Sequence, residues 1–202
     1  MKELTVKKIE SINELNDLSK HEIACVNWPQ EFPYKPEVTF QIGYTTEKLY
    51  VKYNVEEQHI KAEFLNNNET VCKDSCVELF VQPDGSDYYY NLEFNCIGTA
   101  LAARRITRPN AERFTQEQIN KIERISSLPF ESISNEDGGR WNLTIAIPFK
   151  SLHLDTAPKT MRANLYKCGD TTKEPHFVSW SEIPTESPNF HQPEFFGKLN
   201  FE

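Results

Sequence analysis

Hydrophobic and polar residues alternate through the middle of the chain, and this period of two restricts the fold more than any other feature. In residues 37–43 and 48–55 every second residue is apolar. Residues 76–82 and 88–96 show the same pattern around the segment 83–87, which contains the turn residues Pro, Asp and Gly. Such alternation is typical of strands with one buried face, so two β-hairpins are predicted.

Most of the remaining chain also has strand patterns. The further predicted strands are residues 99–106, 122–134, 140–147, 161–168, 175–181 and 196–201. Two short stretches favour helix, one at the capping-box pattern Ser11-x-x-Glu14 and one at 110–122. Neither is long enough to cover a parallel sheet. The predicted fold is all-β, a two-sheet antiparallel β-sandwich of jelly-roll type with one or two short helices.

The chain reads as one domain over residues 1–202, with residues 1–35 as an N-terminal extension packing on the sandwich. Lys and Arg number 22 against 30 Asp and Glu, a net charge of −8, which disfavours nucleic acid and anionic membranes as partners. The sequence shows neither a transmembrane span nor a signal peptide. A cytoplasmic monomer is expected from the sequence as written, or a secreted or periplasmic one if the N-terminus was trimmed.

The cysteines and histidines are irregularly spaced. The five cysteines are Cys25, Cys72, Cys76, Cys96 and Cys168. Their spacing fits neither a complete disulfide framework nor paired Cys-x-x-Cys zinc ligands, so free thiols are expected and no metal site is predicted. The histidines lack the His-x-x-x-His spacing of a zinc helix.

Alternation assigns the side chains of the second hairpin to two faces. The apolar face belongs to the predicted core, which with strand 140–147 includes Val77, Leu79, Leu92, Phe94, Leu143 and Ile145. The opposite face carries Glu78, Asn91, Glu93 and Asn95, with Phe80 and Tyr89 among them, and Asn164 and Tyr166 could extend it. Carboxylates, amides and rings together can hold a sugar, because they bind hydroxyls and stack on C–H faces. An ordinary solvated sheet face is the alternative.

Six segments in order resemble carbohydrate-binding module family 9, and in particular its stand-alone relatives in glycan-degrading bacteria. They are residues 74–80 (DSCVELF), 89–95 (YYNLEFN), 141 with 147–148, 164–166 (NLY), 179–181 (SWS) and 188–199 (PNFHQPEFFGKL). The resemblance implies a β-sandwich of the dopamine-monooxygenase-N-terminal type, which binds sugars or, in some branches, haem. In family 9, two tryptophans sandwich a terminal sugar and side chains of the sheet hold its hydroxyls.

The resemblance also implies roles for single residues. Glu78 matches the family's strand carboxylate, and Phe190 stands where the second sandwiching tryptophan is found. Asn91 occupies the place of a sugar-contacting arginine, and Tyr166 that of a glutamine. The first sandwiching tryptophan has no counterpart, because residues 71–72 are Val and Cys.

Three more residues complete the candidate site. Glu93 shares the polar face with Glu78, and His191 lies in a proline-punctuated loop beside Phe190. Trp180 matches a family position, with a core position in a strand as the alternative. The predicted ligand-binding set is Glu78, Asn91, Glu93, Tyr166, Phe190, His191 and Trp180.

The predicted function is non-catalytic binding of a mono- or oligosaccharide in polysaccharide degradation. One alternative is a glycoside hydrolase that uses Glu78 and Glu93 as a carboxylate pair. A remote alternative is a haem module with Met161 and either His176 or His191 as axial ligands. No cofactor is required by the predicted function. Structural calcium, as in some family members, would use Asp74, Asp84 and Asp87.

Overall fold

The first predicted hairpin forms the centre of one sheet, sheet B. Strands β4 (Glu37–Tyr44) and β5 (Lys48–Glu57) pair antiparallel from Glu37 opposite Glu56 to Tyr44 opposite Leu49. Strand β13 (Gly139–Pro148) pairs with the other side of β5. At the two sides of this group, β11 (Glu123–Ser126) pairs with β13 and β2 (His21–Glu22) pairs with β4. These elements come from a computed structural model, which describes residues 2–202.

The second predicted hairpin forms the centre of the other sheet, sheet A. Its strands are β7 (Cys76–Pro83) and β8 (Tyr89–Asn95). One side of the hairpin continues into β9 (Ala100–Arg105) and β10 (Ala111–Arg113). The other side continues into β14 (Thr160–Cys168), which pairs with β16 (Gly197–Phe201) and β15 (Phe177–Ser179); β3 (Cys25–Val26) follows β15. Both predicted hairpins are confirmed.

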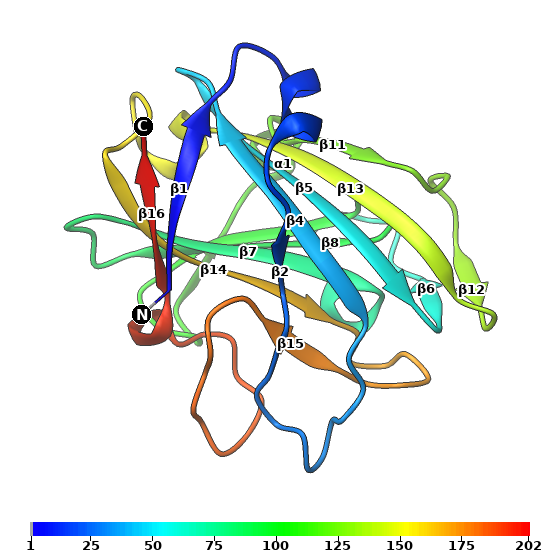
Figure 1. The fold of residues 1–202 in the computed structure, drawn as a ribbon. Helices are drawn as coiled ribbons and strands as arrows, with labels where there is room; N and C mark the ends of the chain where they lie inside the picture. Colours follow the sequence, from blue (N-terminus) through cyan, green and yellow to red (C-terminus); the bar gives the residue numbers. More distant parts are fainter. Residues whose placement is uncertain (1) are drawn as a thin grey trace.

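The N-terminal strand joins the two sheets. In β1 (Glu3–Lys8) the residues from Glu3 to Val6 pair with β16, and Lys7 and Lys8 pair with β4. Both pairings are parallel, whereas an antiparallel arrangement was expected. Figure 1 shows β1 in blue beside β16 in red, at the edge where the sheets approach each other. Alternation over six residues could not reveal these distant partners.

The predicted strand at 122–134 is interrupted. It divides into β11 and β12 (Ile133–Asn135), and β12 pairs with β6 (Ile60–Ala62) in a small separate sheet. Pro129 lies between the two strands. Proline cannot donate a ladder hydrogen bond, and it is confined largely to edges and breaks of sheets.

Helices are short. The α-helix α1 (Gln116–Asn120) begins at a capping box formed by Thr115 and Gln118. The 3₁₀ helices are Ile12–Asp17, Val71–Lys73, Phe149–Leu152 and Pro193–Phe195. The pattern Ser11-x-x-Glu14 correctly places the start of the first of these. Within residues 2–202, the helices are too short or too polar to cross a membrane.

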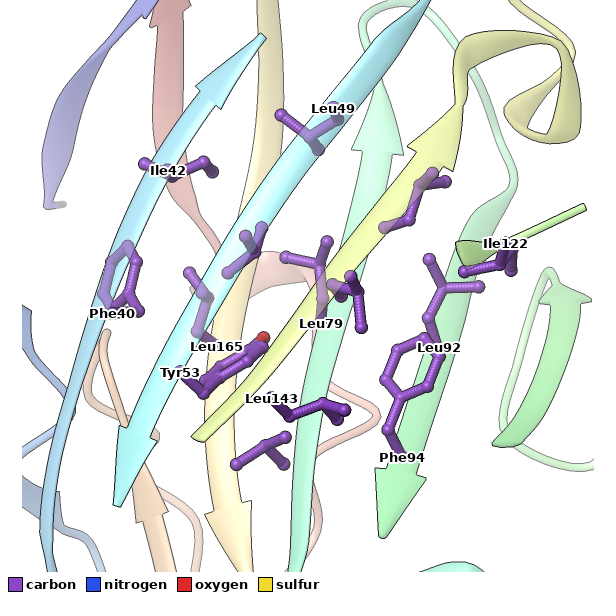
Figure 2. Close-up of a cluster of buried hydrophobic side chains, with 14 of the residues drawn as sticks. Phe40, Ile42, Leu49, Tyr53, Leu79, Leu92, Phe94, Ile122, Leu143 and Leu165 are labelled. Atoms are coloured by element: carbon purple, nitrogen blue, oxygen red, sulfur yellow. The ribbon is translucent and has the colours of Figure 1, made fainter. Parts of the chain in front are cut away.

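The main core lies between the two sheets, where side chains from β4, β5 and β13 face those from β7, β8 and β14 (Figure 2). The six residues predicted to be buried are all fully buried: Val77, Leu79, Leu92, Phe94, Leu143 and Ile145. Tyr53 also lies here, and its hydroxyl donates to the backbone carbonyl of Glu78 at 3.0 Å. The two-sheet sandwich is confirmed.

The outer face of sheet A is covered as well. Loops from the N-terminal segment and from residues 182–195 lie beneath β7 and β14 in Figure 1. They supply Trp28, Ile183 and Phe190 to a second apolar cluster that contains Phe80 and Tyr166, and Phe196, directly after the second loop, also belongs to it. The polar face of the hairpin is therefore enclosed and not an open solvated surface.

Candidate functional site

A cavity of about 190 Å³ lies between the outer face of sheet A and the loops that cover it. Strands β7, β8 and β14 form its floor, and the loops after β9, β14 and β15 form its walls. Its lining residues are Cys72, Glu78, Phe80, Glu93, Arg108, Cys168, Asp170, Phe177, Pro188, Asn189, Phe190 and His191. Four of the seven predicted site residues, Glu78, Glu93, Phe190 and His191, line this cavity.

Two carboxyl groups stand side by side on the cavity floor. Glu78 on β7 and Glu93 on β8 are direct cross-strand partners, and they are 3% and 7% exposed. Burial raises the pKa of Glu93 to about 7, and it raises the pKa of Glu78 well above its usual range, with the charge of Glu93 acting in the same direction. Neighbouring buried carboxylates resist ionising together, so the shared burial and the charge of Glu93 both favour the protonated form of Glu78.

Asn91 supports this pair and does not line the cavity. Its side-chain amide donates to Glu93 Oε1 at 2.8 Å, and its Oδ1 accepts a 2.6 Å hydrogen bond from Arg105 Nε. These two bonds fix the orientation of the amide, because Oδ1 can only accept and Nδ2 can only donate. The positive charge of Arg105 also lowers the pKa of Glu93, which partly opposes the effect of burial.

Phe190 forms one wall of the cavity and covers Tyr166. The two rings are stacked, with centroids 4.1 Å apart and planes 9° apart. The hydroxyl of Tyr166 donates to the backbone carbonyl of Phe190 at 3.1 Å. Tyr166 is fully buried beneath this contact, so it holds the loop in place and does not face the cavity.

His191 lies on the same wall. Its Nδ1 is 2.9 Å from the hydroxyl of Tyr89, and its ring packs against Phe80 with centroids 4.9 Å apart. Burial, together with the charges of Arg105 and Arg108, lowers the pKa of His191 to about 3. The imidazole is therefore neutral at physiological pH and offers one N–H donor and one nitrogen acceptor.

Trp180 lies elsewhere. Its side chain is 4% exposed and belongs to the core between the sheets, where it meets the ring of Phe40 edge-on with centroids 6.1 Å apart. Val178, two residues earlier, belongs to the same core, whereas Phe177 belongs to the outer cluster. Trp180 thus occupies the strand-core position that was the alternative to a ligand contact, and we do not include it in the site.

Several lining residues were not predicted. Arg108, Asp170, Phe177 and Asn189 lie in loops or at strand ends that fold back over sheet A. Arg105 does not line the cavity but binds Asn91 beneath it, and the sequence held a signal for it: in a meander of adjacent strands it falls opposite Tyr89, on the face that carries Glu93. For Asp170 there was none, since its backbone amide binds the carbonyl of Cys72 across nearly a hundred residues of sequence.

The three aspartates considered for calcium do not come together. Asp74 precedes β7, whereas Asp84 and Asp87 lie in the turn at its other end. The carboxylate of Asp74 accepts hydrogen bonds from the backbone amides of Glu63 and Phe64 at 3.0 and 3.1 Å. It therefore braces the start of β7, and these residues do not fit a shared calcium site.

The groups considered for haem are also separated. Met161 is fully buried in the core between the sheets. His191 packs on the outer face of sheet A, and His176 is buried beside Lys167, with 2.7 Å between Nε2 and Nζ. An axial pair of Met161 and His191 would have to reach through the sheet.

Comparison with known proteins gives a consistent result. The chain matches carbohydrate-binding family 9 over residues 7–201. It is 36% identical to a putative carbohydrate-binding protein from Bacteroides uniformis ATCC 8492, whose crystal structure superposes with a TM-score of 0.94, covering 100% of this chain and 99% of that one. A search of the curated proteins gives no match.

Two structures of a family 9 carbohydrate-binding module from Caldicellulosiruptor kristjanssonii share the fold. The complex with glucose has a TM-score of 0.66 at 12% identity, and it covers 100% of this chain and 96% of the other. The complex with cellotriose has a TM-score of 0.64 at 13% identity, with coverage of 100% and 94%. The match over nearly the whole length shows that the chain belongs to carbohydrate-binding family 9, a family of non-catalytic carbohydrate-binding modules.

Proposed function

We propose that this chain binds one terminal sugar unit of a glycan in the cavity above Glu78 and Glu93, and releases it unchanged. The observation that carries this proposal is the pair of buried carboxyl groups on a rigid sheet floor, opposite a wall formed by Phe190 and His191. Family membership supports sugar binding, and the enclosed position of the pair supports this location within the fold.

The chemistry of the cavity suits an uncharged, hydroxyl-rich ligand. A protonated Glu78 both donates and accepts, Glu93 is mainly an acceptor, and Asn189 and Arg108 add donors. Phe80, Phe177 and Phe190 supply apolar surface for C–H groups. Hydroxyl groups pair with both donors and acceptors, so a sugar can satisfy this mixture without bringing in charge.

The size of the cavity limits the ligand. At about 190 Å³ it is smaller than the roughly 300–1,000 Å³ typical of sites for drug-sized molecules. We therefore expect one ring to be enclosed and any further units to extend outward. Glucose and cellotriose are the first ligands to test, because they are bound in the Caldicellulosiruptor structures of the same fold.

Calorimetric titration with monosaccharides and short oligosaccharides tests the proposal. Glu78→Gln should weaken binding of the identified sugar roughly 10- to 100-fold, because the amide does not reproduce the hydrogen bonds of the carboxyl group and leaves a ligand hydroxyl unpaired. The matched control is Glu123→Gln on sheet B, whose side chain is 54% exposed. Equal affinity in the parent and Glu78→Gln would show that the sugar binds elsewhere.

A second measurement addresses turnover. The same oligosaccharides are incubated with the chain, and released reducing ends are measured. No release is expected, in keeping with the family. Release that is lost in both Glu78→Gln and Glu93→Gln would overturn the non-catalytic part of the proposal and favour the carboxylate pair as hydrolytic groups.

A further inference from the structure

Two cysteines from distant parts of the sequence meet beside Glu78. Cys76 begins β7 and Cys168 ends β14, and the two are cross-strand partners. Glu78, two residues after Cys76, projects from the same face of β7. Cys168 Sγ is 3.1 Å from Glu78 Oε1, and one donor atom from each of the three side chains lies within 4.8 Å of the other two.

These atoms are close to the arrangement that a tetrahedral metal ion requires. Zinc binds thiolate at about 2.3 Å and carboxylate oxygen at about 2.0–2.2 Å, so ligand atoms around it lie roughly 3.5–3.8 Å apart. The 3.1 Å between Cys168 Sγ and Glu78 Oε1 and the 4.8 Å limit on all three pairs lie on either side of this range. Both cysteines are on regular strands in the middle of sheet A, which holds ligands more precisely than loops do.

The three groups are buried but not isolated from solvent. Cys76, Cys168 and Glu78 are 0%, 1% and 3% exposed. Cys168 and Glu78 nevertheless line the cavity, together with Cys72 and Asp170. An ion can therefore enter through the cavity, and a fourth coordination position would face it. Three protein ligands with one open position is the pattern of zinc sites that hold an exchangeable water.

We propose that Cys76 Sγ, Cys168 Sγ and the Glu78 carboxylate bind one thiophilic divalent cation of the Zn²⁺ type, with a fourth position filled by water from the cavity. The sequence pattern does not predict this site, because its two cysteines are 92 residues apart and come together only through the pairing of β7 with β14. The proposal does not depend on sugar binding, and it is tested without a sugar. In the metal-bound form Glu78 is a carboxylate ligand and has no proton to donate to a sugar.

The experiment uses the full chain, reduced and freed of metal by a chelator. Zn²⁺ uptake is measured by competition with a chromogenic chelator, and Co²⁺ is used as a spectroscopic probe. We expect one Zn²⁺ per chain, a higher melting temperature on adding Zn²⁺, and a Co²⁺ spectrum with thiolate-to-metal charge transfer and the intense visible bands of tetrahedral coordination.

Variants assign the ligands. Cys76→Ser and Cys168→Ser should each weaken the charge-transfer band, and the double variant should lose it. Each single variant should weaken Zn²⁺ binding by more than the roughly 10–100-fold effect of losing a second-shell partner. Glu78→Gln keeps both thiols and should also weaken Zn²⁺ binding, which covers the case in which a serine variant does not fold. The control is Cys25→Ser, whose Sγ lies 3.4 Å from the carbonyl of Trp180, away from the cavity lining.

Three results would overturn the proposal. The first is a reduced chain that takes up no Zn²⁺. The second is uptake that persists unchanged when Cys76 and Cys168 are both serine. The third is formation of a Cys76–Cys168 disulfide as the only reaction of this pair, with Co²⁺ giving no thiolate band in the reduced chain.

Discussion

The ring of Phe190 lies flat on the ring of Tyr166, with centroids 4.1 Å apart, and so ties the C-terminal loop to the middle strand of sheet A. Phe177 meets Phe190 edge-on with centroids 6.0 Å apart, and Trp28 lies 6.2 Å away. One face of Phe190 is thus already occupied by the protein. In this chain the ring is part of the cavity's framework as well as part of its surface.

Phe190→Ala is therefore expected to destabilise the fold in addition to weakening sugar binding. Phe190 is 8% exposed, and truncation of a buried phenylalanine costs about 3–5 kcal/mol. Urea denaturation measures the change in the free energy of unfolding. Phe130→Ala is the control, because that ring is 65% exposed and should change stability very little. Equal effects of the two substitutions would contradict the framework role of Phe190.

The strand pattern predicted the faces of the central hairpin because alternation is a strict geometric property of a strand. Glu78 and Glu93 fall on the outer face, opposite the buried Leu79 and Leu92, as expected. Strand 175–181 shows the limit of this reasoning. Val178 and Trp180 share the core side there, but the segment is too short for its pattern to decide which side faces inward.

The positions of the loops that cover the site could not be predicted from the sequence. Residues 105–110, 169–176 and 184–196 have no regular period, and their positions depend on single long-range contacts. Two examples are the hydrogen bond from Tyr166 to the carbonyl of Phe190 and that from Asp170 to the carbonyl of Cys72. These loops turn a polar sheet face into an enclosed cavity, and the enclosure produces the shifted pKa values.

Glu93 should make the stability of the chain fall as pH rises. Its pKa is about 7 in the folded state, compared with an ordinary value near 4.5 in the unfolded state. Between these values the folded state binds more protons, so the free energy of unfolding decreases with rising pH. Glu93→Gln removes this effect. Between pH 4.5 and pH 8 its free energy of unfolding should therefore rise by about 2–3 kcal/mol relative to that of the parent.

Urea denaturation of the parent and Glu93→Gln across this pH range measures the difference. Glu123→Gln is the control, since its carboxylate is 54% exposed and lies on sheet B. Parallel pH profiles for the parent and Glu93→Gln would show that the buried carboxyl has an ordinary pKa.

His191, on the opposite wall of the same cavity, should act in the opposite direction. Its pKa is lowered to about 3 in the folded state, whereas an unfolded histidine titrates near 6.5. Between these values the unfolded state binds more protons, so stability is lost as pH falls below about 6.5. Between pH 7 and pH 4, the free energy of unfolding of His191→Asn should therefore fall by about 2–4 kcal/mol less than that of the parent. Thermal denaturation between pH 4 and pH 7 measures it, with the exposed His153→Asn as control.

A buried ion pair connects the two sheets. Lys167 on β14 and Glu57 on β5 are fully enclosed, with 2.8 Å between Nζ and Oε2. Trp141 Nε1 donates to the other carboxylate oxygen, Oε1, at 2.7 Å, and Lys167 Nζ also donates to the carbonyl of Cys168 at 2.8 Å. Removing one partner leaves the other charge buried and unpaired. Lys167→Met alone is expected to destabilise the chain by about 3–5 kcal/mol.

The double variant Glu57→Leu/Lys167→Met should be considerably more stable than the sum of its single variants predicts, because it leaves neither charge unpaired in the core. Urea denaturation of the parent, both single variants and the double variant completes the cycle. Lys173→Met is the control, since its pairing with Glu136 is at the surface and should contribute little. If the single effects simply add, Lys167 and Glu57 are not coupled, and the join between β5 and β14 depends on apolar packing alone.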